Sequence, residues 1–148
     1  ITVTKSGNNI SDYNDLSGKK LAVVTDIAKA ALDKNATIKN NNKNTLYPTL
    51  EDALSALDNG SVDAVITDEF NFSPLKNAEK YQVLNGELDK ISYAFMFKKG
   101  DWVVENWNEA IYELKSPDYN DKDEFTPMVE KYFGYNASSF DYVPSKTK

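Results

Sequence analysis

The chain has 148 residues, 41% hydrophobic and 12% aromatic, which predicts one domain, or one domain with a small appendage, and enough apolar side chains for a core. Lys and Arg number 17 against 23 Asp and Glu, and this formal charge of -6 argues against a nucleic-acid-binding surface. The sequence has no Cys and no His, which excludes disulfides, thiolate or histidine metal sites and Ser-His-Asp catalysis, so we expect a binding protein without metal or cofactor rather than an enzyme.

The first part of the chain predicts a strand, a second strand and a helix. Residues 1–3 alternate apolar side chains with threonine, as a short strand does. Residues 21–24 form a continuous apolar run, which is typical of a strand buried on both faces. Asp26 follows this run and is the expected N-cap of a helix over residues 27–34. The Asn- and Lys-rich residues 39–44 predict an exposed loop.

The next elements continue this alternation. Thr49 begins a capping-box pattern, and the helix that follows is expected to end at Gly60. Residues 62–66 predict a second buried strand, which ends beside the acidic residues Asp68 and Glu69. Further strands are expected at residues 81–84 and 92–97, and helices at residues 102–114 and 127–133. The pattern predicts an α/β fold with at least one parallel βαβ unit.

Several short motifs occur in the order known from one protein family. They are Ile1-Thr2-Val3, residues 15–23, Asp63-Ala64-Val65-Ile66-Thr67-Asp68 at the end of residues 54–68, residues 93–101, residues 107–111 and Glu130-Lys131-Tyr132-Phe133-Gly134. Together they resemble the bacterial extracellular solute-binding proteins of family 3, which deliver amino acids to ABC importers.

The resemblance covers nearly the whole chain but only part of the family's two-lobed fold. It implies a periplasmic-binding-protein-like α/β fold, with a mostly parallel sheet flanked by helices and without the opening half of lobe 1. Residues 1–9 would form a hinge strand and linker, residues 10–99 the α/β domain of lobe 2, and residues 100–148 the C-terminal helices and tail that return to lobe 1. A fragment, a cleaved product and a natural half-module all fit this pattern.

Asp68 is the first candidate for a ligand contact. The resemblance implies that the acid after this strand accepts hydrogen bonds from the α-ammonium of the ligand. The position of Asp68 in the predicted sheet agrees with this role, because open α/β sheets bind ligands beyond the carboxyl ends of their strands. The alternative is an Asp in a turn that caps the next segment.

The loop of Thr25, Asp26, Ile27 and Ala28 is the second candidate, as the wall of lobe 2. Here the sequence departs from the family, which usually has Gly-Thr or Gly-Ser whose amides and hydroxyl meet the ligand carboxylate. An anionic Asp26 would repel a carboxylate. Two consequences are possible: the ligand is cationic or lacks a carboxylate at this end, or the site has lost amino-acid binding. The alternative is that Asp26 is simply an N-cap beside an otherwise usual site.

The sequence thus predicts a substrate-binding module of an amino-acid-type ABC importer that takes a small polar solute without catalysis. The implied partners are an amino-acid-like ligand, an ABC permease, and the missing lobe 1 segment or a second copy of the chain, on the cell surface or in the periplasm. The alternative is a sensor or protein-interaction domain with a degenerate site. Trp102 and Trp107 would be exposed where lobe 1 is incomplete, and such a patch favours partner binding.

Overall fold

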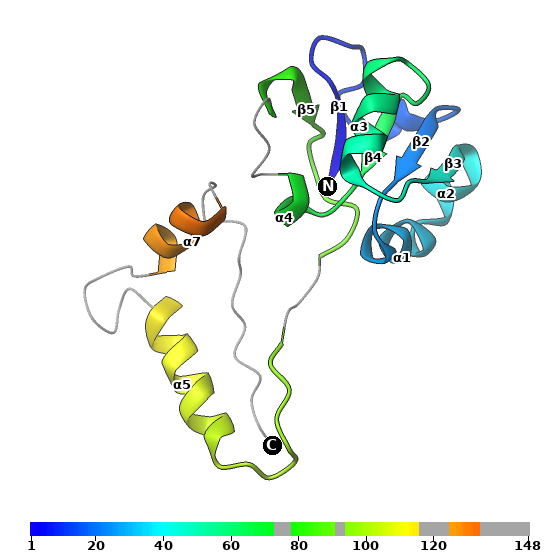
Figure 1. Cartoon of the computed structure of the whole chain (residues 1–148). Helices are drawn as coiled ribbons and strands as arrows, with labels where there is room; N and C mark the ends of the chain where they lie inside the picture. The colour runs from blue at the N-terminus through cyan, green and yellow to red at the C-terminus, as the bar shows by residue number, and fades with distance from the viewer. Residues whose placement is uncertain (73–77, 91–93, 116–124, 134–148) are drawn as a thin grey trace. The chain divides into compact units, whose positions relative to one another are not determined.

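The computed structural model describes residues 1–72, 78–90, 94–115 and 125–133 (Figure 1). The chain divides into two compact units, Ile1–Ile91 and Ser92–Lys148. Among the described residues, no helix combines the length and the apolar character needed to cross a membrane.

The first unit is built on a five-stranded sheet with the order β3-β2-β4-β1-β5. β2 runs parallel to β3 and β4, whereas β1 runs antiparallel to β4 and β5. The expected parallel arrangement is therefore correct for three strands, and β1 and β5 make the sheet mixed. The strands are β1 Thr2–Lys5, β2 Lys20–Val23, β3 Lys43–Leu46, β4 Ala64–Ile66 and β5 Tyr81–Val83.

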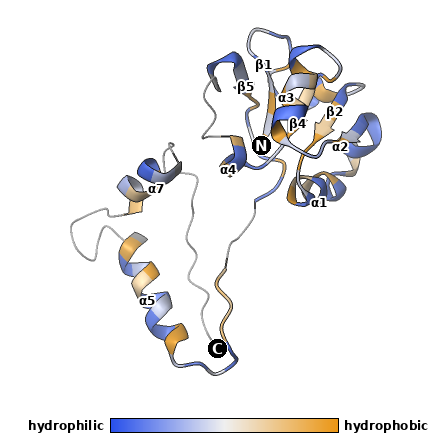
Figure 2. Ribbon diagram, in the orientation of Figure 1, coloured by the Kyte–Doolittle hydropathy of each residue, from blue (hydrophilic) through white to orange (hydrophobic). Residues whose placement is uncertain are grey.

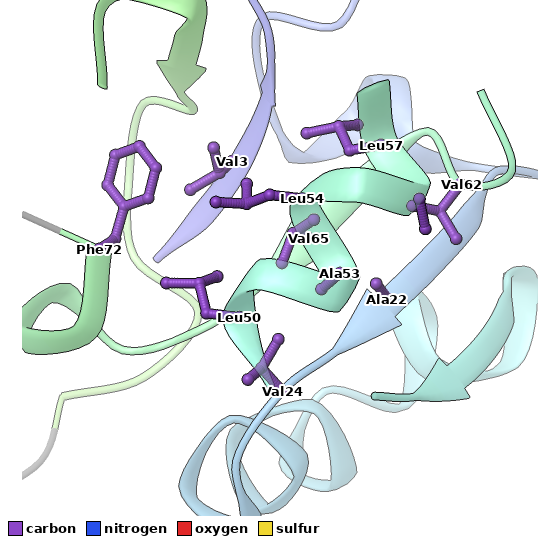
Figure 3. Close-up of a cluster of buried hydrophobic side chains, with 11 residues drawn as sticks. Val3, Ala22, Val24, Leu50, Ala53, Leu54, Leu57, Val62, Val65 and Phe72 are labelled. Atoms are coloured by element: carbon purple, nitrogen blue, oxygen red, sulfur yellow. The ribbon is translucent and has the colours of Figure 1, made fainter. Parts of the chain in front are cut away.

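Helices cover both faces of this sheet. On one face, α3 packs Leu50, Ala53, Leu54 and Leu57 against Val3, Ala22 and Val65, as Figure 3 shows. On the other face, α1 and α2 pack Ala28, Leu32 and Ile38 against Leu21, Val23, Ala64 and Ile66. The helices and 3-10 helices of this unit are η1 Tyr13–Leu16, α1 Asp26–Lys34, α2 Ala36–Asn41, α3 Leu50–Asp58, α4 Glu69–Phe72 and η2 Ala78–Lys80. Successive residues of β2 and β4 thus enter opposite cores, which explains why both strands are apolar throughout.

The prediction of an exposed loop at residues 39–44 is wrong, because these residues belong mainly to α2 and β3. Asn35 caps α2 by accepting from the Ile38 N–H at 3.2 Å, and Lys43–Leu46 form the edge strand β3. All four β3 side chains are exposed, so backbone pairing with β2, rather than burial, holds this strand. A polar edge strand of this kind carries no hydrophobic pattern for a sequence to reveal.

The second unit contains α5, Val103–Lys115, and α7, Phe125–Phe133, which confirms the two expected helices. The strand expected over residues 92–97 is wrong for residues 94–97, which form no regular structure, and its first two residues lie outside the described part. Figure 2 shows this segment as hydrophobic and α5 as a mixture of hydrophobic and hydrophilic residues. Phe95 and Phe97 meet Trp107 of α5 edge-on, with ring centroids 5.1 and 6.1 Å apart. Aromatic packing takes the place of the expected strand pairing there.

Candidate functional site

The two candidate segments lie at the same edge of the sheet. Val23 of β2 pairs with Ile66 of β4, and the Val24 N–H donates to the Ile66 carbonyl at 3.0 Å. Because the two strands are parallel neighbours, the residues that follow them emerge side by side. The structure therefore brings the Thr25 loop and Asp68 to one carboxyl edge.

Thr25, not Asp26, caps α1. Its backbone is extended, with φ -149° and ψ 157°, and its hydroxyl oxygen accepts from the Ala28 N–H at 3.1 Å. The expectation that Asp26 is the N-cap is wrong, since Asp26 is the first helical residue. Thr and Asp are both good caps, and the one with extended backbone takes the role. Thr25 keeps its hydroxyl proton available as a donor.

The other members of this loop differ in exposure. Asp26 is exposed, Ile27 is 39% exposed, and Ala28 is buried in the core beneath α1. Asp26 and Ile27 therefore present their side chains at the surface of this edge. Ala28 serves packing and contributes at most its backbone.

Asp68 caps the short helix α4. One carboxylate oxygen accepts from the Asn71 backbone N–H at 2.9 Å, and the other accepts from the Asn71 side-chain amide at 2.8 Å. These contacts are those of the alternative interpretation, a turn Asp that caps the next segment. A carboxylate has about four acceptor positions, so Asp68 retains capacity for an ammonium group. Its side chain is partly exposed and accessible for such a contact.

Thr67 is a feature that the sequence did not indicate. Its side chain is 2% exposed, and its hydroxyl has no hydrogen-bond partner within the described residues. A buried hydroxyl without a partner is rare, because its desolvation is uncompensated. Thr67 immediately precedes Asp68, so this unsatisfied group lies at the candidate edge. A threonine at the end of an apolar strand gives no sign in the sequence that its hydroxyl lacks a partner.

A hollow lies at the opposite end of the sheet, beside the amino ends of β2 and β4. It is lined in part by Lys5, Asp15 and Asp63. The Lys5 ammonium donates to the Asp58 carbonyl at 2.5 Å, and the Asp63 carboxylate accepts from the Lys20 N–H at 2.8 Å. These charged groups already serve the fold.

The aromatic side chains of the second unit are largely exposed. Phe95 is 66% exposed, Trp102 76% and Trp107 41%, in agreement with the expected exposure of both tryptophans. Exposed aromatic side chains that gather in one unit are typical of surfaces that contact another protein.

No protein-family model and no curated protein sequence matches the chain. Solved structures do match. The second substrate-binding domain of a putative amino acid ABC transporter from Streptococcus pneumoniae is 25% identical, with a TM-score of 0.63 over 90% of this chain and 60% of that one. An ancestral arginine-binding protein bound to arginine is 27% identical, with a TM-score of 0.57 over 90% and 59%. The chain shares the fold of these substrate-binding proteins.

A third match supports the fold alone. Substrate-binding domain 2 of Lactococcus lactis GlnP, in its open conformation, is 23% identical, with a TM-score of 0.66 over 92% of this chain and 58% of that one. The chain thus spans 58 to 60% of the length of these three proteins. The resemblance to family 3 is confirmed in the fold. Substrate-binding proteins of transporters catalyse no reaction, which agrees with the expectation of a binding protein.

Proposed function

We propose that the chain is the solute-binding module of an amino-acid-type ABC importer, with its ligand site at the carboxyl edge of β2 and β4. The observation that carries this proposal is the match over about 90% of the chain to substrate-binding proteins of amino-acid transporters, two of them at 25 and 27% identity. The ligand is a small polar solute, either an amino acid or a related amine. Binding involves closure around the solute and no chemical step.

In this proposal Asp68 accepts hydrogen bonds from the ligand's ammonium group. A charge-assisted contact of this kind is about twice as strong as one between neutral groups. Thr25, Asp26, Ile27 and the backbone of Ala28 form the adjacent wall. Both segments start at the ends of strands that are locked in a packed sheet, so a rigid scaffold positions them.

The remaining assignments belong to the same proposal. Residues 1–9 act as hinge strand and linker, residues 10–99 as lobe 2, and residues 100–148 as the return to lobe 1. The partners are an ABC permease and either a complementary lobe 1 segment or a second copy of the chain. The protein works outside the cell, tethered to its surface, or in the periplasm. Native mass spectrometry of the purified chain would separate these partners by mass.

The test is an NMR titration of the ¹⁵N-labelled chain with L-arginine, L-glutamine and agmatine. We expect at least one probe to shift the amide signals of residues 25–28 and 68. Asp68→Asn keeps the backbone cap, because an asparagine oxygen also accepts from the Asn71 N–H, but it removes the charge and the second contact, with the Asn71 side-chain amide. We expect it to weaken binding by about 10- to 100-fold.

Asp12→Asn is the matched control. Asp12 caps η1 by accepting from the Asn14 N–H at 2.7 Å, and η1 precedes β2, away from the candidate loops. This variant should bind the probe as the unchanged chain does. If no probe shifts the signals of residues 25–28 and 68, the ligand-binding proposal is wrong for this chain.

A sensor or protein-interaction domain with a degenerate site is the second candidate. The charge of Asp26 at the candidate edge and the exposed Trp102 and Trp107 favour it. An absence of ligand binding together with a stable complex through the second unit would support this alternative.

A further inference from the structure

Two asparagines of the chain, Asn59 and Asn85, are followed directly by glycine. The side-chain amide of such an asparagine is open to attack by the backbone nitrogen of the glycine, because glycine has no side chain to shield that nitrogen. The attack needs a backbone that brings the nitrogen against the side-chain carbon Cγ, and a nitrogen whose proton is not held in a hydrogen bond. The local structure of each pair therefore decides whether it reacts.

Asn59 is held in the C-terminal cap of α3. Its backbone N–H donates to the Ser55 carbonyl at 3.0 Å, and its side-chain oxygen accepts from the Ser61 N–H at 2.9 Å. The Gly60 N–H donates to the Leu57 carbonyl at 3.2 Å, as is usual for a glycine that ends a helix. With ψ of -1°, the Asn59 backbone also turns the Gly60 nitrogen away from the Asn59 Cβ. The cap has to open before the two groups can meet.

Asn85 and Gly86 lie in a bend that follows β5, and both are exposed. The last backbone hydrogen bond before them joins the Leu84 N–H to the Thr2 carbonyl at 2.9 Å. Among the described residues, none accepts a hydrogen bond from the Gly86 N–H, and none is hydrogen-bonded to the Asn85 side chain. The nitrogen and the side chain of this pair are therefore both available for reaction.

We propose that Asn85 is a site of spontaneous deamidation, whereas the fold protects Asn59. The Gly86 nitrogen forms a bond to the Asn85 Cγ and passes its proton through water to the side-chain nitrogen. The bond from Cγ to that nitrogen breaks, which releases ammonia and leaves a cyclic succinimide. Water then opens the ring at the side-chain carbonyl, which gives aspartate, or at the backbone carbonyl, which gives isoaspartate. Water is the co-reactant, and nothing is oxidised or reduced.

Deamidation at Asn85 changes the charge at the carboxyl edge of the sheet. β4 and β5 both run antiparallel to β1, so the bend after β5 lies at the edge that carries Asp68. Each event adds a carboxylate there, and isoaspartate also lengthens the backbone between β5 and Ile91, where the first unit ends. The inference goes beyond the proposed function and stands whether or not a ligand binds at this edge.

The test is a time course of the purified chain at neutral and at mildly alkaline pH, followed by peptide mapping with mass spectrometry. Incubation in H₂¹⁸O labels the carboxyl groups that form during the time course. We expect Asn85 to deamidate at least about tenfold faster than Asn59, because the α3 cap must open locally before each attack on Asn59. The rate at Asn85 should rise with pH, because the glycine nitrogen has to lose its proton.

The same time course in urea is the matched control for the fold. Unfolding removes the α3 cap, so the two Asn-Gly pairs should then react at similar rates. Asn85→Gln alters an exposed side chain and should abolish the fast reaction of the folded chain, because glutamine has to close a larger ring. Equal rates at the two sites of the folded chain, or a faster rate at Asn59, would overturn the inference. A rate at Asn85 that is much slower in the folded chain than in urea would also overturn it.

Discussion

Replacing Thr67 by valine should stabilise the first unit. The two side chains have nearly the same shape, and the variant removes a hydroxyl that is buried without a partner. Burying an unpaired hydroxyl costs about 1 to 3 kcal/mol in proteins. We therefore expect the free energy of unfolding to rise by about 1 to 2 kcal/mol. In a unit of this size, each kcal/mol raises the melting temperature by about 4 to 8 °C.

Thr4→Val is the matched comparison. Thr4 is also fully buried in the sheet, but its hydroxyl lies 3.4 Å from the Lys5 carbonyl and 3.4 Å from the Asn8 side-chain oxygen, so its one proton has an acceptor. Losing these contacts should lower the free energy of unfolding by about 0.5 to 1.5 kcal/mol. Urea denaturation followed by circular dichroism measures both changes. If Thr67→Val destabilises as much as Thr4→Val, the Thr67 hydroxyl has a partner and the reasoning fails.

Three further predictions concern local structure. Thr25→Ala removes the cap of α1 and should lower the free energy of unfolding by about 1 kcal/mol in urea; no change would contradict the capping role. Gly60→Ala should lower the free energy of unfolding by about 1 kcal/mol, because Gly60 has a positive φ of +79° that an alanine adopts only with backbone strain. No atom would clash with the added Cβ, so this strain is the whole effect, and an unchanged melting temperature would refute it. The hydrogen bonds from Lys29, and to a lesser extent from Lys39, lower the pKa of the Asp33 carboxyl from 3.8 to about 2. These contacts therefore stabilise the folded state fully above about pH 4, and this stabilisation is lost as the pH falls towards 2. An NMR titration of the side-chain carboxyl carbon checks this, and a midpoint near 3.8 would contradict it.

The parts of the fold that bury apolar side chains were predictable from the sequence. β2 and β4 lie between two helical layers, so their whole length is apolar and marks them as strands. β3 was missed because backbone pairing holds an exposed strand of Lys, Asn, Thr and Leu. The segment at residues 94–97 was misread, because aromatic side chains packed on Trp107 imitate the alternation of a strand.

The site was predictable only as far as topology fixes it. Strand direction brings Thr25 and Asp68 to one edge, and two buried runs in the sequence suffice to infer this. Whether Thr25 or Asp26 caps α1 depends on backbone angles, since both residue types cap well. The missing partner of Thr67 depends on atoms from several elements, and no local pattern encodes it.

The position of β1 between β4 and β5 sets an order on how the first unit can form. Thr2 pairs with Ile66, and Val3 pairs with Val83, so β1 cannot complete its pairing until segments much later in the chain have been synthesised. β2, β3 and β4 can assemble before β5 exists, but β1 keeps one unpaired edge until residue 83 has emerged from the ribosome. Contacts this distant in sequence are entropically expensive and slow to form. A nascent chain stalled before β5 should therefore expose the unpaired backbone N–H and C=O groups of β1, and chaperone binding at that stage would protect the chain from aggregation.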